Sequence, residues 1–227
     1  MGALAAVLWL LAAAGGLIWW TAGDGGLLGR EMLRYAAPEK TGLPEAEYAG
    51  VGRMTADYLT GRTDRFQYIF SDAEGKTYQC FQEHEAAHMA DCRKLIALSG
   101  RVCLGALGGL AVCLLIAMAP GRSFARENRR AFGQGMLRGM AAMGILAAAL
   151  LTWAIVDFDG FFTAFHRIAF DNEGWLLNPR TDLLIRLMPT AFFIGLGLRG
   201  LGFWGIAAVV AIATMIWMKA GESVRIR

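Results

Sequence analysis

The residues best suited to chemistry are three histidines, His84, His88 and His166. An imidazole has an unperturbed pKa of about 6.5, so it can accept and donate a proton near neutral pH. His84 and His88 lie in one polar segment and His166 in another, and each segment stands next to a long apolar run. Each histidine by itself is equally well explained as a surface or packed side chain. Together they predict one shared site, if both segments face the same side of a membrane.

The segment His84-Glu85-Ala86-Ala87-His88 also fits the pattern H-E-x-x-H. In that pattern two histidines four residues apart on a helix bind zinc, and the glutamate acts as a base. His166 is then a candidate third ligand. The motif is short enough to arise by chance, and no characteristic third-ligand motif follows it. A zinc-dependent membrane protease is therefore the alternative interpretation.

The composition favours a membrane protein. Hydrophobic residues make up 56% of the 227 residues, whereas soluble domains contain about 45–50%. The net charge is only +3, and the basic residues form no cluster of the kind that binds nucleic acid. We therefore expect no nucleic-acid partner. The four cysteines predict no disulfide framework, although Cys80 and Cys92 could pair in an oxidising compartment.

Four apolar runs are long enough to cross a bilayer, which takes about 20 helical residues. We predict membrane helices at residues 1–22, 101–120, 139–156 and 189–218. A cleaved signal peptide is the alternative for the first run, but that run lacks a basic start and carries Trp19-Trp20 where an interfacial anchor belongs. Arg199, inside the fourth run, should face the interior of the bundle or lie at its outer edge.

The charges of the connecting segments predict the orientation. Residues 121–138 contain five arginines and one acid, and the tail 219–227 is also basic. Residues 157–188 instead contain five acids and three arginines before the next span. By the positive-inside rule, both termini and residues 121–138 are cytoplasmic, and residues 23–100 and 157–188 are extracytoplasmic. The predicted fold is a mostly α membrane protein with four transmembrane helices and a small extracytoplasmic α/β cap.

The larger extracytoplasmic segment shows ordered patterns. Leu43-Pro44-Glu45 is typical of a helix start, and apolar residues then recur at helical spacing to Leu59. Residues 66–70 and 76–81 alternate around the turn-forming residues 72–75, which predicts a β-hairpin with one apolar face. A helix should follow from Phe81 and run without a break into the second span. In the smaller segment, the aromatic-rich residues 161–166 suit the membrane interface.

Two motifs resemble the lipoprotein intramolecular transacylase (Lit) family. One is Glu85-x-x-His88-Met89-x-Asp91, just before the second span. The other, more specific because it matches many fixed spacings, is Phe162-x-x-Phe165-His166-x-x-x-Phe170-x-Asn172-x-x-Trp175-x-x-x-Pro179-x-x-Asp182-x-Leu184-Ile185. His88 and His166 are similar to the two essential histidines of the family. His84 matches no family position, which favours chance as the origin of H-E-x-x-H.

The resemblance implies an acyltransferase of the bacterial cytoplasmic (inner) membrane, with its active site on the extracytoplasmic face. Its substrates would be diacylglyceryl-modified bacterial lipoproteins within the membrane lipid. The sn-2 acyl chain would move to the α-amine of the N-terminal cysteine of the same molecule, giving the lyso-form lipoprotein. Because an ester becomes an amide, the reaction needs no ATP, and the sequence contains no P-loop. We expect neither a cofactor nor a metal.

His88 and His166 are the predicted catalytic residues, and four others are supporting candidates. Asp91 is three residues past His88, close enough on a helix to orient its ring. Arg167 could bind an oxyanion or a lipid headgroup, and Asn172 and Asp182 could hold the second extracytoplasmic segment in place. A non-enzymatic membrane sensor or partner subunit remains a third interpretation.

Overall fold

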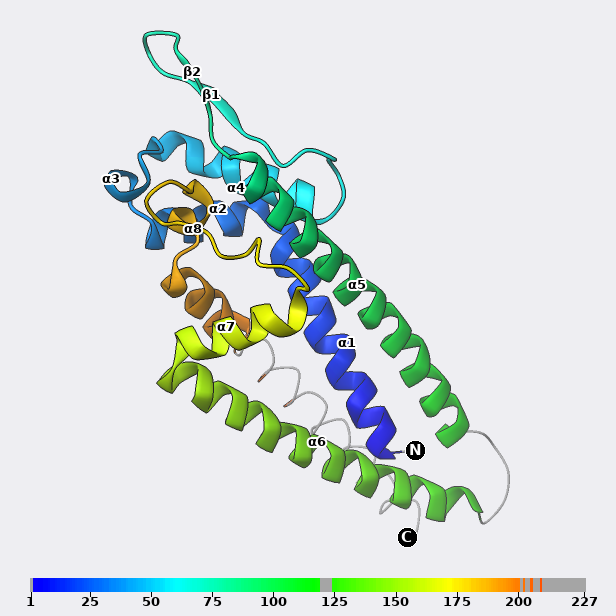
Figure 1. Ribbon diagram of the computed structural model, residues 1–227. Coiled ribbons are helices and arrows are strands. Elements are labelled where there is room, and N and C mark those ends of the chain that lie inside the picture. The colour runs from blue at the N-terminus through cyan, green and yellow to red at the C-terminus, as the bar shows by residue number, and fades with distance from the viewer. Residues whose placement is uncertain (1, 119–123, 201, 203–204, 206–208, 210–227) are drawn as a thin grey trace. The chain divides into compact units, whose positions relative to one another are not determined.

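The computed structural model describes residues 2–118, 124–200, 202, 205 and 209. The chain divides into two compact units. The first contains Met1–Gly15, Val102–Leu150 and Leu198–Arg227, and the second contains Gly16–Arg101 and Leu151–Gly197. The elements, labelled in Figure 1, are α1 (Gly2–Gly23), α2 (Gly25–Tyr35), α3 (Pro38–Thr41), η1 (Glu45–Glu47), α4 (Tyr48–Leu59), β1 (Ile69–Ser71), β2 (Thr77–Gln79), α5 (Glu83–Met118), α6 (Phe124–Val156), α7 (Phe158–Ala169) and α8 (Leu183–Leu187).

Among the described residues, three helical stretches are long and apolar enough to cross a membrane: Gly2–Gly23, Glu83–Ile116 and Phe132–Val156. They correspond to the first three predicted spans. Large apolar side chains on α5 and α6 are exposed, for example Leu115 at 70% and Ile145 at 73%, as lipid-facing positions require. Residues 190–200 are helical. Most of the predicted fourth span, 189–218, and the whole tail lie outside the described residues.

Small residues bring α1 and α6 into close contact within the first unit. A Cβ atom added to Gly139 would lie 2.7 Å from the Cβ of Ala6, and one added to Gly135 would lie 3.1 Å from the backbone N of Ala3. Gly135 and Gly139 are four residues apart, so they share one face of α6. Such small-residue spacing lets membrane helices approach closely, which maximises van der Waals contact. A larger side chain at Gly139 would therefore force the two helices apart.

The segment predicted as a cytoplasmic loop, 121–138, is helical from Phe124 onward. The prediction of a loop was wrong because it took the end of the apolar run as the end of the helix. No proline interrupts residues 124–156, and alanine, arginine and glutamate are good helix formers. The helix therefore continues beyond the stretch that is apolar enough to enter a membrane. Residues 121–123 lie outside the described residues.

The predicted elements of the cap are present in the second unit. A helical region begins at Glu45, as expected, and α4 ends at Leu59. Strands β1 and β2 pair antiparallel with Phe70 opposite Tyr78, and Gly75 in the turn has a φ of 80°. The strands are shorter than predicted. Helix α5 then runs unbroken from Glu83 to Met118, as predicted. The helices α2, α3, α7 and α8 were not predicted.

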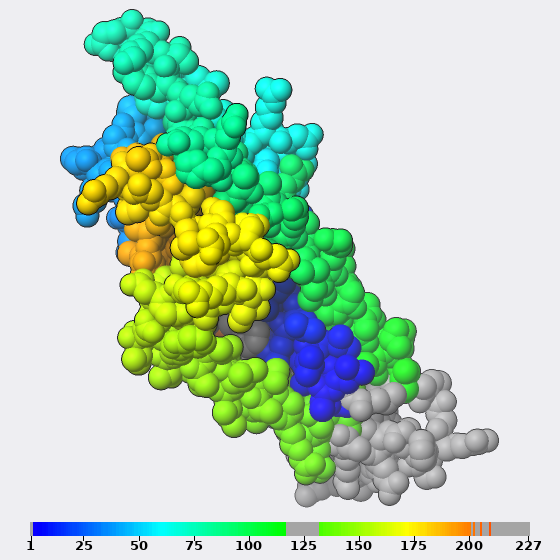
Figure 2. Space-filling view, in the orientation of Figure 1, coloured from blue at the N-terminus to red at the C-terminus, as the bar shows by residue number. Residues whose placement is uncertain are grey.

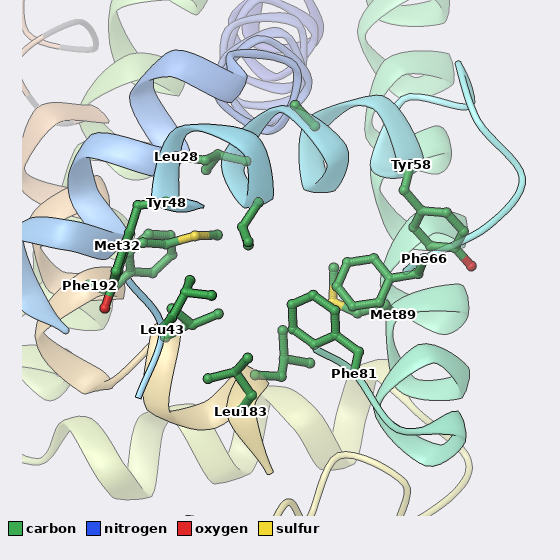
Figure 3. Packing of buried hydrophobic residues seen from close by; sticks show 14 residues of the cluster. Leu28, Met32, Leu43, Tyr48, Tyr58, Phe66, Phe81, Met89, Leu183 and Phe192 are labelled. Atoms are coloured by element: carbon green, nitrogen blue, oxygen red, sulfur yellow. The ribbon is translucent and has the colours of Figure 1, made fainter. Parts of the chain in front are cut away.

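The core of the second unit lies between α2, α4, α8 and the first turns of α5 (Figure 3). Helices α2 and α4 touch through glycines, since a Cβ atom added to Gly52 would lie 2.4 Å from the backbone N of Gly29. Met32, Val51 and Leu187 are completely buried in this core. The aromatic rings of Phe66 and Phe81, on either side of the hairpin, pack with their centroids 4.6 Å apart and their planes inclined by 44°. The core therefore joins the base of the hairpin to α8.

The segment between α7 and α8 lies along the start of α5. In Figure 2 its yellow atoms are beside the green atoms of α5. Two hydrogen bonds hold it there: Asn172 donates to Asp91 at 2.9 Å, and Gln82 donates to the carbonyl of Thr181 at 3.3 Å. The two extracytoplasmic segments predicted from the sequence therefore pack against each other within one unit.

Candidate active site

The first turns of α5 carry most of the polar residues singled out in the sequence. His84, Glu85, His88, Asp91 and Cys92 are spaced so that they share one helix face. Charged residues occur along α5 up to Arg101, and an apolar stretch without charged residues begins at Val102. His88 is 14 residues before Val102, about 21 Å along a helix that rises ~1.5 Å per residue. The site therefore precedes the uncharged apolar stretch of α5.

The second candidate, His166, lies in the last turns of α7. The side chain of Asp157 caps this helix, with Oδ1 accepting the backbone N–H of Gly160 at 2.9 Å. His166 is 5% exposed. Four aromatic rings surround its imidazole, with centroids 4.0–5.4 Å away: Phe162, Phe165, Phe170 and Trp175. The imidazole therefore sits in an apolar box that excludes most water.

The structure brings His88 and His166 together. Their ring centroids are 6.0 Å apart, and the rings are inclined by 31°. Phe170 contacts both rings, with centroid distances of 5.3 Å to His88 and 5.4 Å to His166. His88 is also nearly buried, at 9% exposure. Two imidazoles from α5 and α7 thus lie next to each other.

A hydrogen bond determines which nitrogen of His166 carries its proton. Nδ1 of His166 lies 2.8 Å from the backbone oxygen of Phe162. A carbonyl oxygen only accepts hydrogen bonds, so Nδ1 must be the donor. In a neutral imidazole the other nitrogen then has no proton. Nε2 of His166 therefore has a free lone pair and can act as a base.

Burial keeps both imidazoles neutral at physiological pH. It lowers the pKa of His88 to about 4, with a further lowering from nearby His166 that the carboxylate of Asp91 partly offsets. Burial also lowers the pKa of His166, although its bond to the carbonyl of Phe162 acts in the opposite direction. A pair of neutral imidazoles can supply one lone pair and one N–H. Those are the two groups that proton transfer and oxyanion binding require.

Cys92 contacts His88, one helical turn away, and sequence analysis missed this contact. Its Sγ lies 3.5 Å from Nε2 of His88. Burial raises the pKa of the Cys92 thiol to about 12, with a smaller contribution from Asp91. The sulfur therefore keeps its proton at neutral pH. The only signal in the sequence was the spacing of four residues, which alone does not distinguish such a pair from two packed side chains.

Asp91 does not orient His88 by a hydrogen bond, contrary to the expectation. Its Oδ1 accepts from Nζ of Lys94 at 2.7 Å and its Oδ2 accepts from Nδ2 of Asn172 at 2.9 Å. Within the described part of the chain, no hydrogen bond joins Asp91 to His88. These bonds lower the pKa of Asp91, so it stays ionised. Asp91 and Asn172 instead attach the segment after α7 to α5.

His84 and Asp182 make a second attachment between the same elements. Nε2 of His84 lies 3.0 Å from Oδ2 of Asp182. Asp182 is 2% exposed and also accepts from the hydroxyl of Thr181 and the backbone N–H of Asn178. Burial would raise the pKa of Asp182, but the hydrogen bonds from Thr181, His84 and Asn178 lower it to about 2. The expected role of Asp182 in holding this segment thus has a structural basis.

Glu85 makes the third attachment, which the sequence did not reveal. Its side chain is completely buried. Oε1 accepts the backbone N–H of Leu184 at 2.7 Å, and Oε2 accepts that of Gln82 at 2.8 Å. One carboxylate therefore joins the beginnings of α5 and α8. The longer motif of the sequence reaches this contact, because it includes Leu184.

These contacts give the protease interpretation no support. Both oxygens of Glu85 are engaged by backbone amides, so this carboxylate is not available to take a proton from a zinc-bound water. Nε2 of His84 is paired with Asp182. Within the described residues, no group of three or more histidine, cysteine, aspartate or glutamate side chains is arranged to hold a metal ion.

Arg167 is not part of the cluster around the two imidazoles. Its side chain is exposed and forms no hydrogen bond or ion pair to any described residue. The apolar side chains beside it, Phe165 and Ile168, are 49% and 86% exposed. Arg167 therefore lies on an apolar surface of α7. Among the described residues its side chain makes no hydrogen bond to His166, and a role in binding lipid can be tested by substitution.

The chain is similar to a known family and to solved structures. The family model "Lipoprotein intramolecular transacylase Lit" matches residues 2–193. The membrane-integral lipoprotein intramolecular transacylase Lit of Bacillus cereus has a similar fold, with a TM-score of 0.74 and 15% sequence identity over 97% of this chain and 95% of that chain. A histidine-to-arginine variant of that protein matches with a TM-score of 0.68 and 14% identity over 98% and 92%. No curated protein sequence matches significantly.

Proposed function

Since this chain belongs to the lipoprotein intramolecular transacylase (Lit) family, we propose that His88 and His166 are the catalytic pair of its acyl transfer. The chain is a membrane acyltransferase whose substrates are lipoproteins, as the family match implies. The observation that supports this pair is its geometry: two buried, neutral imidazoles from separate helices with centroids 6.0 Å apart.

The proposed reaction takes place within one diacylglyceryl lipoprotein. The α-amine of its N-terminal cysteine attacks the carbonyl carbon of the sn-2 ester, forming a C–N bond. The amine loses a proton, and the carbonyl oxygen becomes an oxyanion. The bond from carbon to the glycerol oxygen then breaks, and that oxygen takes up a proton. The product is an N-acylated lyso-form lipoprotein, and no separate acyl donor is consumed.

The hydrogen bonds of the site suggest a role for each histidine. His166 is the general base, because its Nε2 has a free lone pair while Nδ1 donates to Phe162. His88 donates a hydrogen bond to the oxyanion. His166, protonated by the amine, then gives that proton to the glycerol oxygen, so both rings return to their starting states. An α-amine has a pKa of about 7.7–8.0, so a useful fraction is already neutral at physiological pH. The amine and the ester share one molecule, which removes much of the entropic cost of bringing them together.

The site faces the extracytoplasmic side of the bacterial cytoplasmic membrane in this proposal. Support comes from the charge asymmetry between arginine-rich residues 121–138 and acidic residues 157–188, because the positive-inside rule assigns such segments to opposite sides. The proposed topology has four spans, with the fourth at residues 189–218. The substrates are diacylglyceryl-modified bacterial lipoproteins, which reach the site from the surrounding lipid. No nucleic acid takes part.

The test is the mass of a lipoprotein N-terminal peptide after incubation with the purified protein in lipid. A synthetic diacylglyceryl-cysteinyl peptide should give a product of unchanged mass whose fragment ions place one acyl chain on nitrogen. The His88→Ala and His166→Ala proteins should leave the substrate unchanged. A chelator should have no effect on the wild-type reaction. Cleavage of the peptide backbone that chelator stops would instead support the protease.

A further inference from the structure

His88 has one neighbour whose contribution is still unexplained. Its Nε2 lies 3.5 Å from Sγ of Cys92. The residue expected to orient this ring, Asp91, is instead hydrogen-bonded to Lys94 and Asn172. On the other side, the edge of the ring packs against Phe170 at a centroid distance of 5.3 Å and an angle of 70°. Cys92 is therefore the polar side chain that the structure pairs with the imidazole of His88.

We propose that Cys92 is a positioning residue that donates its S–H to Nε2 of His88, so that the neutral ring carries its proton on Nδ1. His88 then presents a fixed N–H donor to the reacting acyl group. The inference rests on the proposed function, because the tautomer of His88 matters for the reaction only if His88 takes part in the acyl transfer.

The direction of this hydrogen bond follows from the chemistry of the two groups. The lone pair of a neutral imidazole nitrogen is a good acceptor, whereas a thioether or thiol sulfur accepts only weakly. The thiol also keeps its proton, since partial burial raises the pKa of Cys92 to about 12. The burial that lowers the pKa of His88 keeps its ring neutral, so that a lone pair is present to be bound. The S–H group is therefore the donor.

The two histidines then have complementary tautomers. His166 donates from Nδ1 to the carbonyl of Phe162 and has its lone pair on Nε2. His88 accepts at Nε2 from Cys92 and has its N–H on Nδ1. One ring thus offers a base and the other a donor before substrate arrives. An intramolecular acyl shift needs one of each, because a proton must leave the amine while the oxyanion is stabilised.

The size of the effect should be modest, because a thiol is a weak donor. The net value of one neutral hydrogen bond corresponds to about a 2- to 13-fold change in an equilibrium. Replacing Cys92 by alanine should lower kcat by a factor in this range. KM should change little, because Cys92 acts through His88 and does not touch the substrate. Serine also donates a hydrogen bond, so Cys92→Ser should recover at least part of kcat.

The experiment compares the purified full chain with its Cys92→Ala and Cys92→Ser variants in lipid at pH 7. Nitrogen-15 chemical shifts of labelled histidine distinguish Nδ1–H from Nε2–H, and a His88→Gln variant assigns the signal. Cys80→Ala is the matched control, because Cys80 is the other half-buried cysteine of the same unit. Wild type should show Nδ1–H for His88, Cys92→Ala should shift toward Nε2–H, and Cys80→Ala should change neither the tautomer nor kcat. An unchanged His166 signal shows that each variant is folded.

Two results would overturn the inference. One is an Nε2–H tautomer of His88 in the wild-type protein. The other is a Cys92→Ala variant that keeps both the wild-type tautomer and the wild-type kcat. Failure of the proposed function has a different outcome, namely a wild-type chain that forms no lyso-lipoprotein. The chemical shifts would in that case still decide whether Cys92 sets the tautomer of His88.

Discussion

The carboxylate of Glu85 accepts the backbone N–H of Leu184 at 2.7 Å, joining residues 99 positions apart in the chain. Its second oxygen accepts the N–H of Gln82 at the beginning of the same helix as Glu85. Because the side chain is completely buried, neither amide N–H can form a hydrogen bond with water instead if the carboxylate is removed. This contact ties α8, and with it the segment after His166, to the helix that carries His88.

Glu85→Ala should therefore destabilise the cap. Hydrogen bonds to a charged acceptor contribute roughly 1.5–3 kcal/mol, and leaving a buried donor unsatisfied adds a further cost. We expect the free energy of unfolding to fall by about 2–4 kcal/mol on the same scale, together with activity. Glu85→Gln, which keeps one acceptor oxygen, should lose less. Chemical unfolding in detergent measures the change.

Glu74→Gln is the control for Glu85, since Glu74 is an exposed residue of the hairpin turn. Its unfolding free energy should stay within about 0.5 kcal/mol of wild type, as for most surface substitutions. Equal stability of the Glu85→Ala and Glu74→Gln proteins would contradict the attachment proposed for Glu85.

His88→Ala and His166→Ala should each abolish formation of the lyso-lipoprotein while the protein still accumulates in the membrane. Positioned acid–base catalysis contributes about 10²–10⁴-fold, so either loss should be visible in an end-point assay. If the two rings act as a unit, the double variant should be little worse than either single one. If the activity losses of the two single variants multiply in the double variant, the two histidines have independent roles.

His84→Ala is the matched control for the catalytic pair and should keep most of the activity. His84 is exposed and touches Asp182, which two other donors also bind. Inactivation equal to that of His88→Ala, together with loss of bound zinc from both variants, would move the metal-dependent interpretation to first place.

Asp91→Asn and Asn172→Ala should cause milder losses than either histidine change. Asn172→Ala removes the donor of the 2.9 Å hydrogen bond that attaches the segment after α7 to α5, and Asp91→Asn removes the charge of its acceptor. Both weaken the attachment without removing a group from the reaction. Since the two residues share one bond, the double variant should lose about as much activity as the worse single variant. Kinetics of the four proteins measure this coupling, and strictly multiplicative losses would show that the bond does not connect their effects.

Activity should rise with pH as the substrate amine loses its proton, with a pKa of about 7.7–8.0. Protonation of the histidines should cause a second, steeper loss below pH 6.5, because burial lowers the pKa of His88 to about 4 and also lowers that of His166. Initial rates between pH 4 and 9 should show both losses. A second loss centred at pH 6.5 would mean that the imidazoles are not buried as described.

The same lowered pKa values should make the cap less stable in acid. Between pH 6.5 and about 4 the unfolded chain binds a proton at position 88, whereas the folded chain does not. Stability therefore rises with pH through this window and falls as pH drops. The Tm of wild type should decrease across it more steeply than that of His88→Gln, which cannot titrate at this position.

Much of the local structure was predictable from the sequence alone. The apolar runs predicted helices over residues 2–22, 101–118 and 139–156, because a bilayer requires a continuous apolar stretch. Helical spacing predicted that the second of these begins earlier, after Phe81. The turn at residues 72–75 and the helix that ends at Leu59 followed from spacing and turn chemistry, which act between neighbours in the chain. The histidines were identified by residue type and by the motifs around them. These features depend on interactions over a few residues, which the order of the residues encodes directly.

Only the tertiary structure decided how these pieces meet. The hydrogen bonds from Glu85 to Leu184 and from Asn172 to Asp91 join residues 99 and 81 positions apart, and no local pattern specifies such partners. Asp91 is not a hydrogen-bond partner of His88, because its carboxylate accepts from Asn172 and Lys94. The side chain that does contact His88 is Cys92. The burial of His166 also depends on the tertiary structure, because the rings around it come from earlier residues of α7 and from the segment that follows α7. The lowered pKa values of His88 and His166 are thus a property of packing, which the types of residue permit but do not determine.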